Sequence, residues 1–328
     1  MDQRSQTIFT EHKDFVLSEV ASRYGIKESQ LTRLGSFESF VYEFEQQSRQ
    51  YILKITHSIH RSADAIRGEL DWTNFLADHG VSVGRAISSI NGEMVEIVGV
   101  DDSHFLVYAF EKVDGHCPGK DDWSDQLFQN WGETLGKMHA ATKNYNPPSS
   151  ALKRHEWHED EYRDPDKYLP ADQPLVIQRC HEVEQRLHAL PADVDSYGLI
   201  HSDLHHGNFF VTESGITVFD FDDCHYDWFS NDIAITLFYM LRDESIGENV
   251  PFARRFLEGI MTGYEWENHL DLKWMKCIPD FLKLREIELY IIIHAEDAHN
   301  LNGWCHRFME NRRERIEDDV PVIDMEFS

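Results

Sequence analysis

Three side chains that could bind a metal ion and move a proton lie in one short stretch, residues 198–223, GLIHSDLHHGNFFVTESGITVFDFDD. The pattern predicts a short apolar strand, a polar loop and two further strands joined by a Ser-Gly turn. Asp203 and Asn208 belong to the loop and the strand start after it, and Asp220 to the last strand. Carboxylate and amide oxygens suit Mg²⁺, which takes one or two protein carboxylates together with phosphate oxygens. One carboxylate then remains to orient or deprotonate an attacking hydroxyl group.

The histidines of the same loop allow a different interpretation. His201, His205 and His206, together with Asp203, could bind zinc. Against this, the HxHxDH order of common zinc hydrolases is absent, and a zinc site would leave the FDFDD strand without a role. We therefore prefer the magnesium interpretation and keep zinc as the alternative. His201 is interpreted as a packing and hydrogen-bonding residue.

The motifs HSDLHHGN and VFDFDD resemble the catalytic and metal-binding motifs of the aminoglycoside phosphotransferase and choline kinase family. These small-molecule kinases are relatives of protein kinases, whose HRDxxxxN and DFG motifs do the same work. The resemblance implies that Asp203 is the catalytic-loop aspartate and that Asn208 and Asp220 are Mg²⁺ ligands. It also implies an α+β, two-lobed protein-kinase-like fold. In that fold the N-terminal lobe is an antiparallel sheet plus a helix, and the larger C-terminal lobe is mainly helical.

The function that the resemblance implies is magnesium-dependent transfer of the γ-phosphate of ATP or GTP to a hydroxyl group of a small molecule. Acceptors in the family include aminoglycosides, choline, ethanolamine, homoserine and sugars, and most of them carry an amine. Two other classes remain open: a protein Ser/Thr kinase of the same fold, and a non-catalytic kinase-like protein that binds a nucleotide. The non-catalytic class is disfavoured because all five expected polar groups are present, namely Lys54, Glu69, Asp203, Asn208 and Asp220.

The N-terminal lobe must present a lysine to the nucleotide phosphates and an acid that orients this lysine. Alternating apolar and polar residues predict strands within residues 31–56, and a helix over 62–79 follows them. Lys54 lies in the apolar strand YILKIT, and Glu69 lies on the following helix. The family carries its lysine and glutamate at these places, so the resemblance assigns the pair to nucleotide binding.

The hairpin before Lys54 matches the one that covers the nucleotide phosphates in the family. Its segment LGSFESFVYEF lacks the GxGxxG pattern, so Gly35 and Ser36 are the predicted contacts to phosphate oxygens. Further along, HFLVYAFE runs into KVDG. Here the resemblance implies that the Glu111 carbonyl and the Val113 amide bind the edge of the adenine ring.

Turn formers and charges in EKVDGHCPGKDD mark a predicted domain boundary. We expect residues 1–112 to form the nucleotide-binding lobe, and residues 113–328 to form a helical lobe with the catalytic loop and the acceptor site. A helix is predicted over residues 124–139, and its His139 also matches the family pattern. Asp232, in SNDIA, is interpreted as a structural residue that caps a helix or braces the catalytic loop.

An acceptor with an amine would need acidic or aromatic partners in the second lobe. Glu286, Tyr290 and Asp297 fall near one stripe of a helix predicted over residues 280–298, and such side chains can hold an ammonium group. The plainer alternative is a solvated, charged helix face. The net charge of −28 lies mostly beyond residue 112, and it would either attract a cationic acceptor or serve solubility alone.

Composition excludes several other classes of protein. The N-terminus is polar, and no run of about 18 apolar residues is present, so neither a secretory signal nor a transmembrane helix is predicted. The five cysteines are odd in number and contain no CxxC pair, which indicates reduced thiols. The negative charge repels nucleic acid and anionic lipid. We therefore expect a cytoplasmic protein that binds a nucleotide and a small acceptor, with no nucleic-acid or membrane partner.

Overall fold

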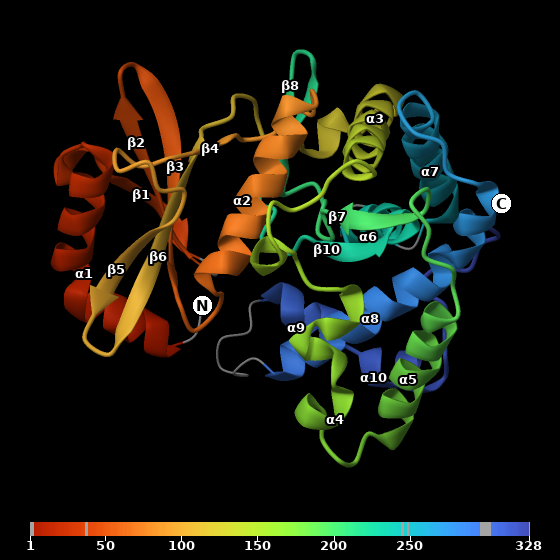
Figure 1. Cartoon of the computed structure of the whole chain (residues 1–328). Helices are drawn as coiled ribbons and strands as arrows, with labels where there is room; N and C mark the ends of the chain where they lie inside the picture. Colours follow the sequence, from red (N-terminus) through yellow and green to blue (C-terminus); the bar gives the residue numbers. More distant parts are fainter. Residues whose placement is uncertain (1–2, 37–38, 244–245, 248, 296–302, 328) are drawn as a thin grey trace.

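A computed structural model describes residues 3–36, 39–243, 246–247, 249–295 and 303–327. Its helices are α1 (Gln3–Tyr24), α2 (Ala63–Asp78), α3 (Asp125–Thr142), α4 (Pro165–Tyr168), α5 (Pro174–His188), α6 (Phe229–Leu241), α7 (Val250–Tyr264), α8 (Ile278–Ala295), α9 (Gly303–Met309) and α10 (Arg312–Glu317). Its strands are β1 (Thr32–Ser36), β2 (Phe40–Gln46), β3 (Arg49–His57), β4 (Ala86–Ile87), β5 (Glu96–Val100), β6 (Ser103–Glu111), β7 (Tyr197–Ile200), β8 (Phe209–Thr212), β9 (Gly215–Val218) and β10 (His225–Trp228). Among the helices of these ranges, none is long and apolar enough to cross a membrane. An antiparallel sheet with two helices lies at one end of the molecule and a helical body at the other, which confirms the expected α+β fold (Figure 1).

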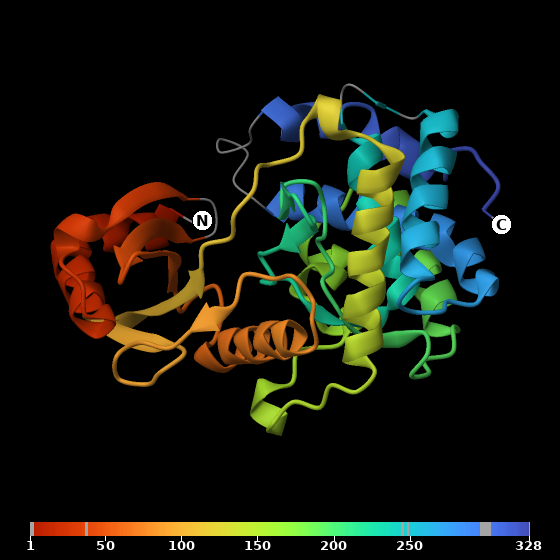
Figure 2. The same ribbon diagram turned by 90° about the horizontal axis from the view of Figure 1, so that it is seen from above.

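The sheet of the first lobe is antiparallel, with strand order β1-β2-β3-β6-β4 and with β5 paired to β6. Side chains alternate between its two faces. Leu53 and Ile55 of β3 are fully buried in a cluster with residues of α1, so Lys54 between them faces the other way. Lys54 pairs in register with Tyr108 of β6, which packs against α2. The lysine is therefore on the side of the sheet that faces α2. Figure 2 shows α2, in orange, between the sheet and the helical lobe.

The helix boundaries follow the capping residues. Ser62 begins α2 by accepting a hydrogen bond from the Ala65 amide at 3.1 Å, and Ser124 begins α3 in the same way. The helices predicted over residues 62–79 and 124–139 are confirmed, and α3 runs on to Thr142. The helix predicted over residues 280–298 is confirmed as α8 up to Ala295, and its last three residues lie outside the described ranges.

The stretch around the HSDLHHGN motif forms two small antiparallel pairs, β7 with β10 and β8 with β9. The strand that was expected to continue through Asp220 ends at Val218, so that part of the prediction was wrong. Asp220 has φ of 67°, a left-handed conformation that a strand cannot contain. Asp220 therefore belongs to a turn after the strand, where its side chain leaves the hairpin.

Glycines allow α3 and α7 to approach until their backbones touch. A Cβ atom on Gly132 would lie 1.9 Å from the Ile260 carbonyl oxygen, and one on Gly263 would lie 1.8 Å from that of Gln129. Backbone atoms cannot move aside as the end of a long side chain can. The contact matters for the site because α3 also carries His139.

Gly263→Ala should lower the free energy of unfolding by at least about 2 kcal/mol, because the added methyl group forces the two helices apart. Urea unfolding followed by circular dichroism measures the change. The control is Gly99→Ala in β5, where no heavy atom lies within 4 Å of the new Cβ. The control should stay within about 0.5 kcal/mol of the parent protein. Equal stability of both variants would contradict the close backbone contact.

Candidate active site

A buried carboxylate holds the turn that carries Asp203. Asp232, at the start of α6, is fully buried and accepts hydrogen bonds from the amides of His201 at 3.1 Å and Ser202 at 2.9 Å. Ser202 has φ of 67°, a conformation that is unfavourable for a residue with a side chain unless its surroundings hold it. The interpretation of Asp232 as a brace of this loop is thus confirmed.

The brace is itself supported from α3. His139 Nε2 lies 3.1 Å from Asp232 Oδ2, and Tyr264 of α7 donates its hydroxyl hydrogen to Nδ1 of the same ring at 2.9 Å. Burial opposes ionisation of Asp232, but the hydrogen bonds from His139 and the loop amide outweigh it and lower the pKa of this carboxyl. The loop therefore has an ionised acceptor at its base.

His201 connects the two motifs, as its structural interpretation requires. Its Nε2 donates to the Phe219 carbonyl oxygen at 3.2 Å, and its Nδ1 accepts from the Asp203 amide at 3.3 Å. The Phe219 amide in turn donates to the Asn208 carbonyl oxygen at 3.0 Å. These bonds place Asn208 opposite Phe219, which directly precedes Asp220 in the chain.

Both oxygens of Asp203 are held by hydrogen bonds. Asn208 Nδ2 donates to Asp203 Oδ2 at 3.1 Å and to the Asp203 carbonyl at 2.9 Å, which leaves the amide oxygen of Asn208 available to a cation. Asp203 Oδ1 accepts from the guanidinium of Arg285 at 2.8 Å. Arg285 comes from α8, and no pattern in the sequence pointed to it.

Lys54 bridges the two lobes. Its Nζ donates to Asp220 Oδ1 at 2.5 Å and to Asp222 Oδ1 at 2.9 Å. Burial alone would lower the pKa of Lys54, but the two carboxylates raise it well above its usual value. The lysine is therefore a fixed positive charge next to a predicted metal ligand. Asp222 was not predicted, although the repeated aspartates of FDFDD made it a candidate.

Glu69 is fully buried and sits beside Asp222. No donor from the described residues meets either of its carboxyl oxygens, so the expected Lys54–Glu69 hydrogen bond is not formed in this arrangement. Burial, and then the charge of Asp222, raise the pKa of Glu69 well above its usual value. Asp222 is held in the charged form by Lys54 and Arg61, which lower its pKa in spite of burial. Of the two buried carboxyl groups, Glu69 is therefore the one whose surroundings disfavour the charged form.

A third arginine fixes the helix that carries Glu69. Arg154 is 4% exposed, and its guanidinium donates to the carbonyl oxygens of Ala65 in α2, Asp222 and Cys224. The segment before it packs on α2 at Gly68, where a Cβ would lie 2.3 Å from the Leu152 carbonyl oxygen. This clamp between α2 and the metal loop was also missed, because it depends on backbone acceptors that sequence patterns do not reveal.

The remaining predicted nucleotide contacts lie around the first lobe. Gly35 and Ser36 end β1, where the strand register shifts, and residues 37–38 between them and β2 lie outside the described part. Glu111 ends β6, and its amide donates to the Arg85 carbonyl at 2.8 Å. Val113 follows where the chain leaves the sheet, 3.4 Å from a Cβ built on Gly84. The predicted phosphate contacts are therefore at the end of the edge strand β1, and the predicted adenine contacts are at and after the end of β6, which lies inside the sheet between β3 and β4.

The zinc alternative lacks a ligand set in the described residues. Within those ranges no group of three or more His, Cys, Asp or Glu side chains is arranged to hold a metal ion. His201 is buried and uses both ring nitrogens within the protein. Two oxygen ligands supplemented by phosphate and water fit the residues better, because Mg²⁺ and Ca²⁺ accept such mixed shells.

The predicted ammonium site on α8 is not formed. Glu286 is fully buried and paired with Lys283 at 2.7 Å and with Arg312, and the Tyr290 hydroxyl donates to Gln173 at 2.8 Å. Asp297 lies outside the described residues. Glu286 and Tyr290 do lie on one face of α8, but that face points into the core instead of toward a ligand.

A cavity of about 410 Å³ opens close to Asp203. Its lining residues come from the loop, from α6 and the turn after it, and from α9, namely His206, Tyr239, Arg242, Asp243, Trp304 and Arg307. The Tyr239 ring packs against His205 in a tilted arrangement, with the ring centres 4.6 Å apart, and its hydroxyl accepts a hydrogen bond from Arg285 at 2.7 Å. Tyr239, which belongs to the cavity wall, therefore shares the Arg285 guanidinium with the Asp203 carboxylate.

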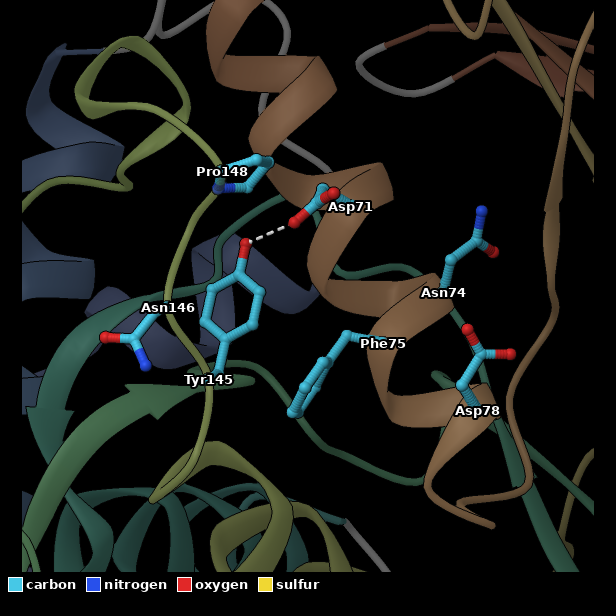
Figure 3. Close-up of a pocket in the computed structure, with 7 residues that line it drawn as sticks. All are labelled: Asp71, Asn74, Phe75, Asp78, Tyr145, Asn146 and Pro148. Carbon is cyan, nitrogen blue, oxygen red and sulfur yellow. Dashed lines mark hydrogen bonds between the residues drawn. The ribbon is translucent and has the colours of Figure 1, made fainter.

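A second hollow, of about 330 Å³, lies between α2 and the segment after α3 (Figure 3). Asp71, Asn74, Phe75 and Asp78 line it at helical spacing, on the face of α2 turned away from Glu69. The Tyr145 hydroxyl donates to Asp71 at 2.8 Å across it. The hollow contains none of the predicted site residues and serves the packing of α2 against the second lobe.

Comparison with known proteins agrees with this geometry. The model of the family described as "Phosphotransferase enzyme family" matches residues 30–270. Amicoumacin kinase from Bacillus subtilis (strain 168) is 39% identical over 321 residues, which cover 97% of this chain and 96% of that protein.

Two solved structures extend the comparison. The amicoumacin kinase hAmiN in complex with AMP-PNP, Ca²⁺ and Ami superposes with a TM-score of 0.93 at 39% identity, over 100% of this chain and 99% of that one. A microcompartment-associated aminopropanol kinase superposes with a TM-score of 0.72 at 22% identity, over 93% and 98% of the two chains. The second likeness concerns the fold alone.

The proton on Glu69 gives a pH-dependent stability that can be measured. Because folding raises the pKa of Glu69, its contribution is complete below the ordinary glutamate value of about 4.3 and is lost as pH rises toward the raised value. Glu69→Gln cannot lose a proton there. Its unfolding free energy should therefore rise relative to the parent from about pH 5 upward, by at most about 1.4 kcal/mol per pH unit.

Urea unfolding at a series of pH values tests this prediction. The matched control is Glu133→Gln, which removes a partly exposed carboxylate paired with Lys137 on α3. A difference between Glu69→Gln and the parent that stays constant across the pH range would show that Glu69 is ionised in the folded protein.

Proposed function

The chain belongs to the phosphotransferase enzyme family, and from this we propose that it phosphorylates a hydroxyl group of amicoumacin or of a closely similar small molecule. The observation that carries the proposal is the likeness to amicoumacin kinase along the whole chain, 39% identity over 97% of it. The chain is a kinase that uses a nucleotide and a divalent metal ion. Our proposal concerns the identity of the acceptor, the use of Mg²⁺ as the metal ion and the roles of the individual site residues.

The two lobes divide the work in this proposal. Residues 1–112 bind the nucleotide, with Lys54 on its phosphates, Gly35 and Ser36 above them, and the Glu111 carbonyl and Val113 amide on the base. The position of Lys54 supports this, because its ammonium group is buried between the lobes and next to Asp220. Residues 113–328 supply the metal ligands, Asp203 and the acceptor site.

Glu69 acts in this proposal on the surroundings of Lys54. As a neutral acid it leaves Lys54 to Asp220 and Asp222 while no nucleotide is bound. The loss of its proton would offer Lys54 a further carboxylate on α2. Arg154 keeps that helix close to the metal loop in either case.

Asn208 and Asp220 are the proposed ligands of Mg²⁺. The amide nitrogen of Asn208 is used by Asp203, so its oxygen is the atom left for a cation. Burial raises the pKa of Asp220, and Asp222 adds to this, so a cation beside these carboxylates is electrostatically favourable. The ion, when bound, neutralises the charge that develops on the transferred phosphoryl group.

Asp203 is the proposed base. Its carboxylate is partly exposed, is held from two sides, and lies next to the cavity lined by Tyr239. A hydroxyl group entering from that cavity would be aligned by Asp203 for in-line attack on the γ-phosphate, and would pass its proton to the carboxylate late in the transfer. No covalent intermediate on the protein is needed.

The cavity near Asp203 is the proposed acceptor site. Its size lies within the range of ligand pockets for small organic molecules. Its wall combines aromatic rings with Arg242, Arg307 and Asp243, so it can meet ring systems and groups of either charge. An amine remains compatible through Asp243, whereas the net negative charge of the lobe does not by itself select one.

The proposed acceptor can be tested with the purified protein, ATP and Mg²⁺. Amicoumacin should give nucleotide turnover and a phosphorylated product by mass spectrometry, well above aminopropanol, choline and spectinomycin at equal concentration. Chelation should stop the reaction, and Mg²⁺ should restore a higher kcat than Ca²⁺, because Ca²⁺ imposes a looser geometry on phosphate oxygens. Turnover with another acceptor but none with amicoumacin would overturn the choice of substrate.

Asp203→Asn should reduce kcat by at least about a hundredfold, because the amide can no longer accept the hydroxyl proton. Nucleotide affinity, measured by calorimetry, should be unchanged within about twofold, because Asp203 is not a proposed nucleotide contact. The control is Asp195→Asn, which alters an 80% exposed carboxylate paired with Lys143. A variant at position 203 with near-parental kcat would remove Asp203 from the mechanism.

A further inference from the structure

Arg285 of α8 connects Asp203 to the wall of the acceptor cavity, because one of its nitrogen atoms donates hydrogen bonds to both. Its NH2 nitrogen donates to Asp203 Oδ1 at 2.8 Å and to the Tyr239 hydroxyl at 2.7 Å. Its NH1 nitrogen donates to Glu288 Oε2 at 2.9 Å. The side chain is 11% exposed, so the three bonds are made with little competition from water.

The guanidinium is itself fixed by a line of alternating charges. Glu288 is 11% exposed and pairs through its other oxygen with Arg163, which is 7% exposed, at 3.2 Å. Burial opposes these charges, but the neighbouring groups keep the pKa of Arg285 well above its usual value and that of Glu288 below it. The four residues Arg163, Glu288, Arg285 and Asp203 therefore form one ordered row that ends at the proposed base.

The row limits the rotation of the Asp203 carboxylate. The last torsion of an aspartate is broad and nearly twofold, so a carboxylate at the edge of a cavity would sample many orientations. Here Arg285 donates to Oδ1 at 2.8 Å, Asn208 donates to Oδ2 at 3.1 Å, and His205 Nε2 lies 3.4 Å from Oδ2. A carboxylate offers about four acceptor positions, so these neighbours restrict its rotation and an acceptor hydroxyl must use a position that they leave.

We propose that Arg285 is a positioning residue for phosphoryl transfer: it orients the Asp203 carboxylate toward the hydroxyl of an acceptor bound beside Tyr239. The inference rests on the proposed role of Asp203. Arg285 acts through Asp203 and takes no proton, since a guanidinium stays charged at any pH at which the protein folds. The row from Arg163 supplies the rigidity, and the shared NH2 atom sets the carboxylate relative to the cavity wall.

Arg285→Ala should lower kcat by about a hundredfold, the cost expected for a misplaced reacting group, with the KM for ATP unchanged within about twofold. The double variant Asp203→Asn with Arg285→Ala should be no slower than Asp203→Asn alone, because the arginine acts only through the aspartate. Guanidinium chloride should restore part of the kcat of Arg285→Ala, whereas sodium chloride at the same ionic strength should not.

Two further variants separate positioning from folding. Arg285→Lys keeps one cation in place but cannot reach all three partners, so its kcat should lie between those of the parent and Arg285→Ala. The matched control is Arg186→Gln, which should keep the parental kcat. Arg186 is a surface residue of α5 and pairs at 2.8 Å with Asp280 of α8, the helix that also carries Arg285. Melting curves confirm that each variant is folded before its kinetics are compared.

The inference is overturned if folded Arg285→Ala keeps a kcat within about threefold of the parent, if Arg285→Lys is as slow as Arg285→Ala, or if the effects of Arg285→Ala and Asp203→Asn multiply. An inactive Asp203→Asn together with an active Arg285→Ala would leave the proposed function standing and remove only the role of Arg285. An active Asp203→Asn would instead remove the proposed base.

Discussion

The buried carboxylate of Asp232 is the contact on which the geometry of the site depends. It accepts hydrogen bonds from the backbone amides of His201 and Ser202. These two donors lie in the strained turn before Asp203, away from water, and Asp232 supplies the acceptors that they need. His139 of α3 bonds to the Asp232 carboxylate and lowers its pKa. Helix α3 can lie close enough for this bond because its glycines allow backbone contact with α7. The conformation of the catalytic loop thus depends on Asp232, and the position of Asp232 depends on the packing of α3 against α7.

Buried charge ties the other half of the site together. Lys54 reaches from the first lobe to Asp220 and Asp222, and Arg154 reaches back from the second lobe to the end of the same loop and to α2. Taking such groups out of water is costly, and each is retained here with full partners. The exception is Glu69, whose carboxyl oxygens meet no donor among the described residues and whose pKa is raised by burial. The lobes are therefore held together by charged side chains and backbone carbonyls.

Local patterns predicted the parts of this site that depend on short range. The alternation in β3 put Lys54 on the face opposite Leu53 and Ile55, and the motif around Asp203 and Asn208 gave two neighbours that do lie in hydrogen-bond contact. Helices α2 and α3 begin directly after Ser62 and Ser124, where the predicted helical ranges start. The strand through Asp220 was placed too long, because its left-handed φ is set by the turn that follows and not by the apolar pattern.

The sequence by itself determined the order of the site residues and the kind of chemistry they serve, because both follow from residue types at fixed spacing, and the resemblance of its motifs to a known family implied the fold class. Only the tertiary structure decided that Lys54 meets Asp220 and Asp222, that Glu286 is buried in an ion pair, and that Arg285 reaches Asp203. A charged residue on a helix gives the same sequence pattern whether its helix face meets solvent or the core. Which partner it finds depends on how helices far apart in the chain pack together, and no local pattern contains that information.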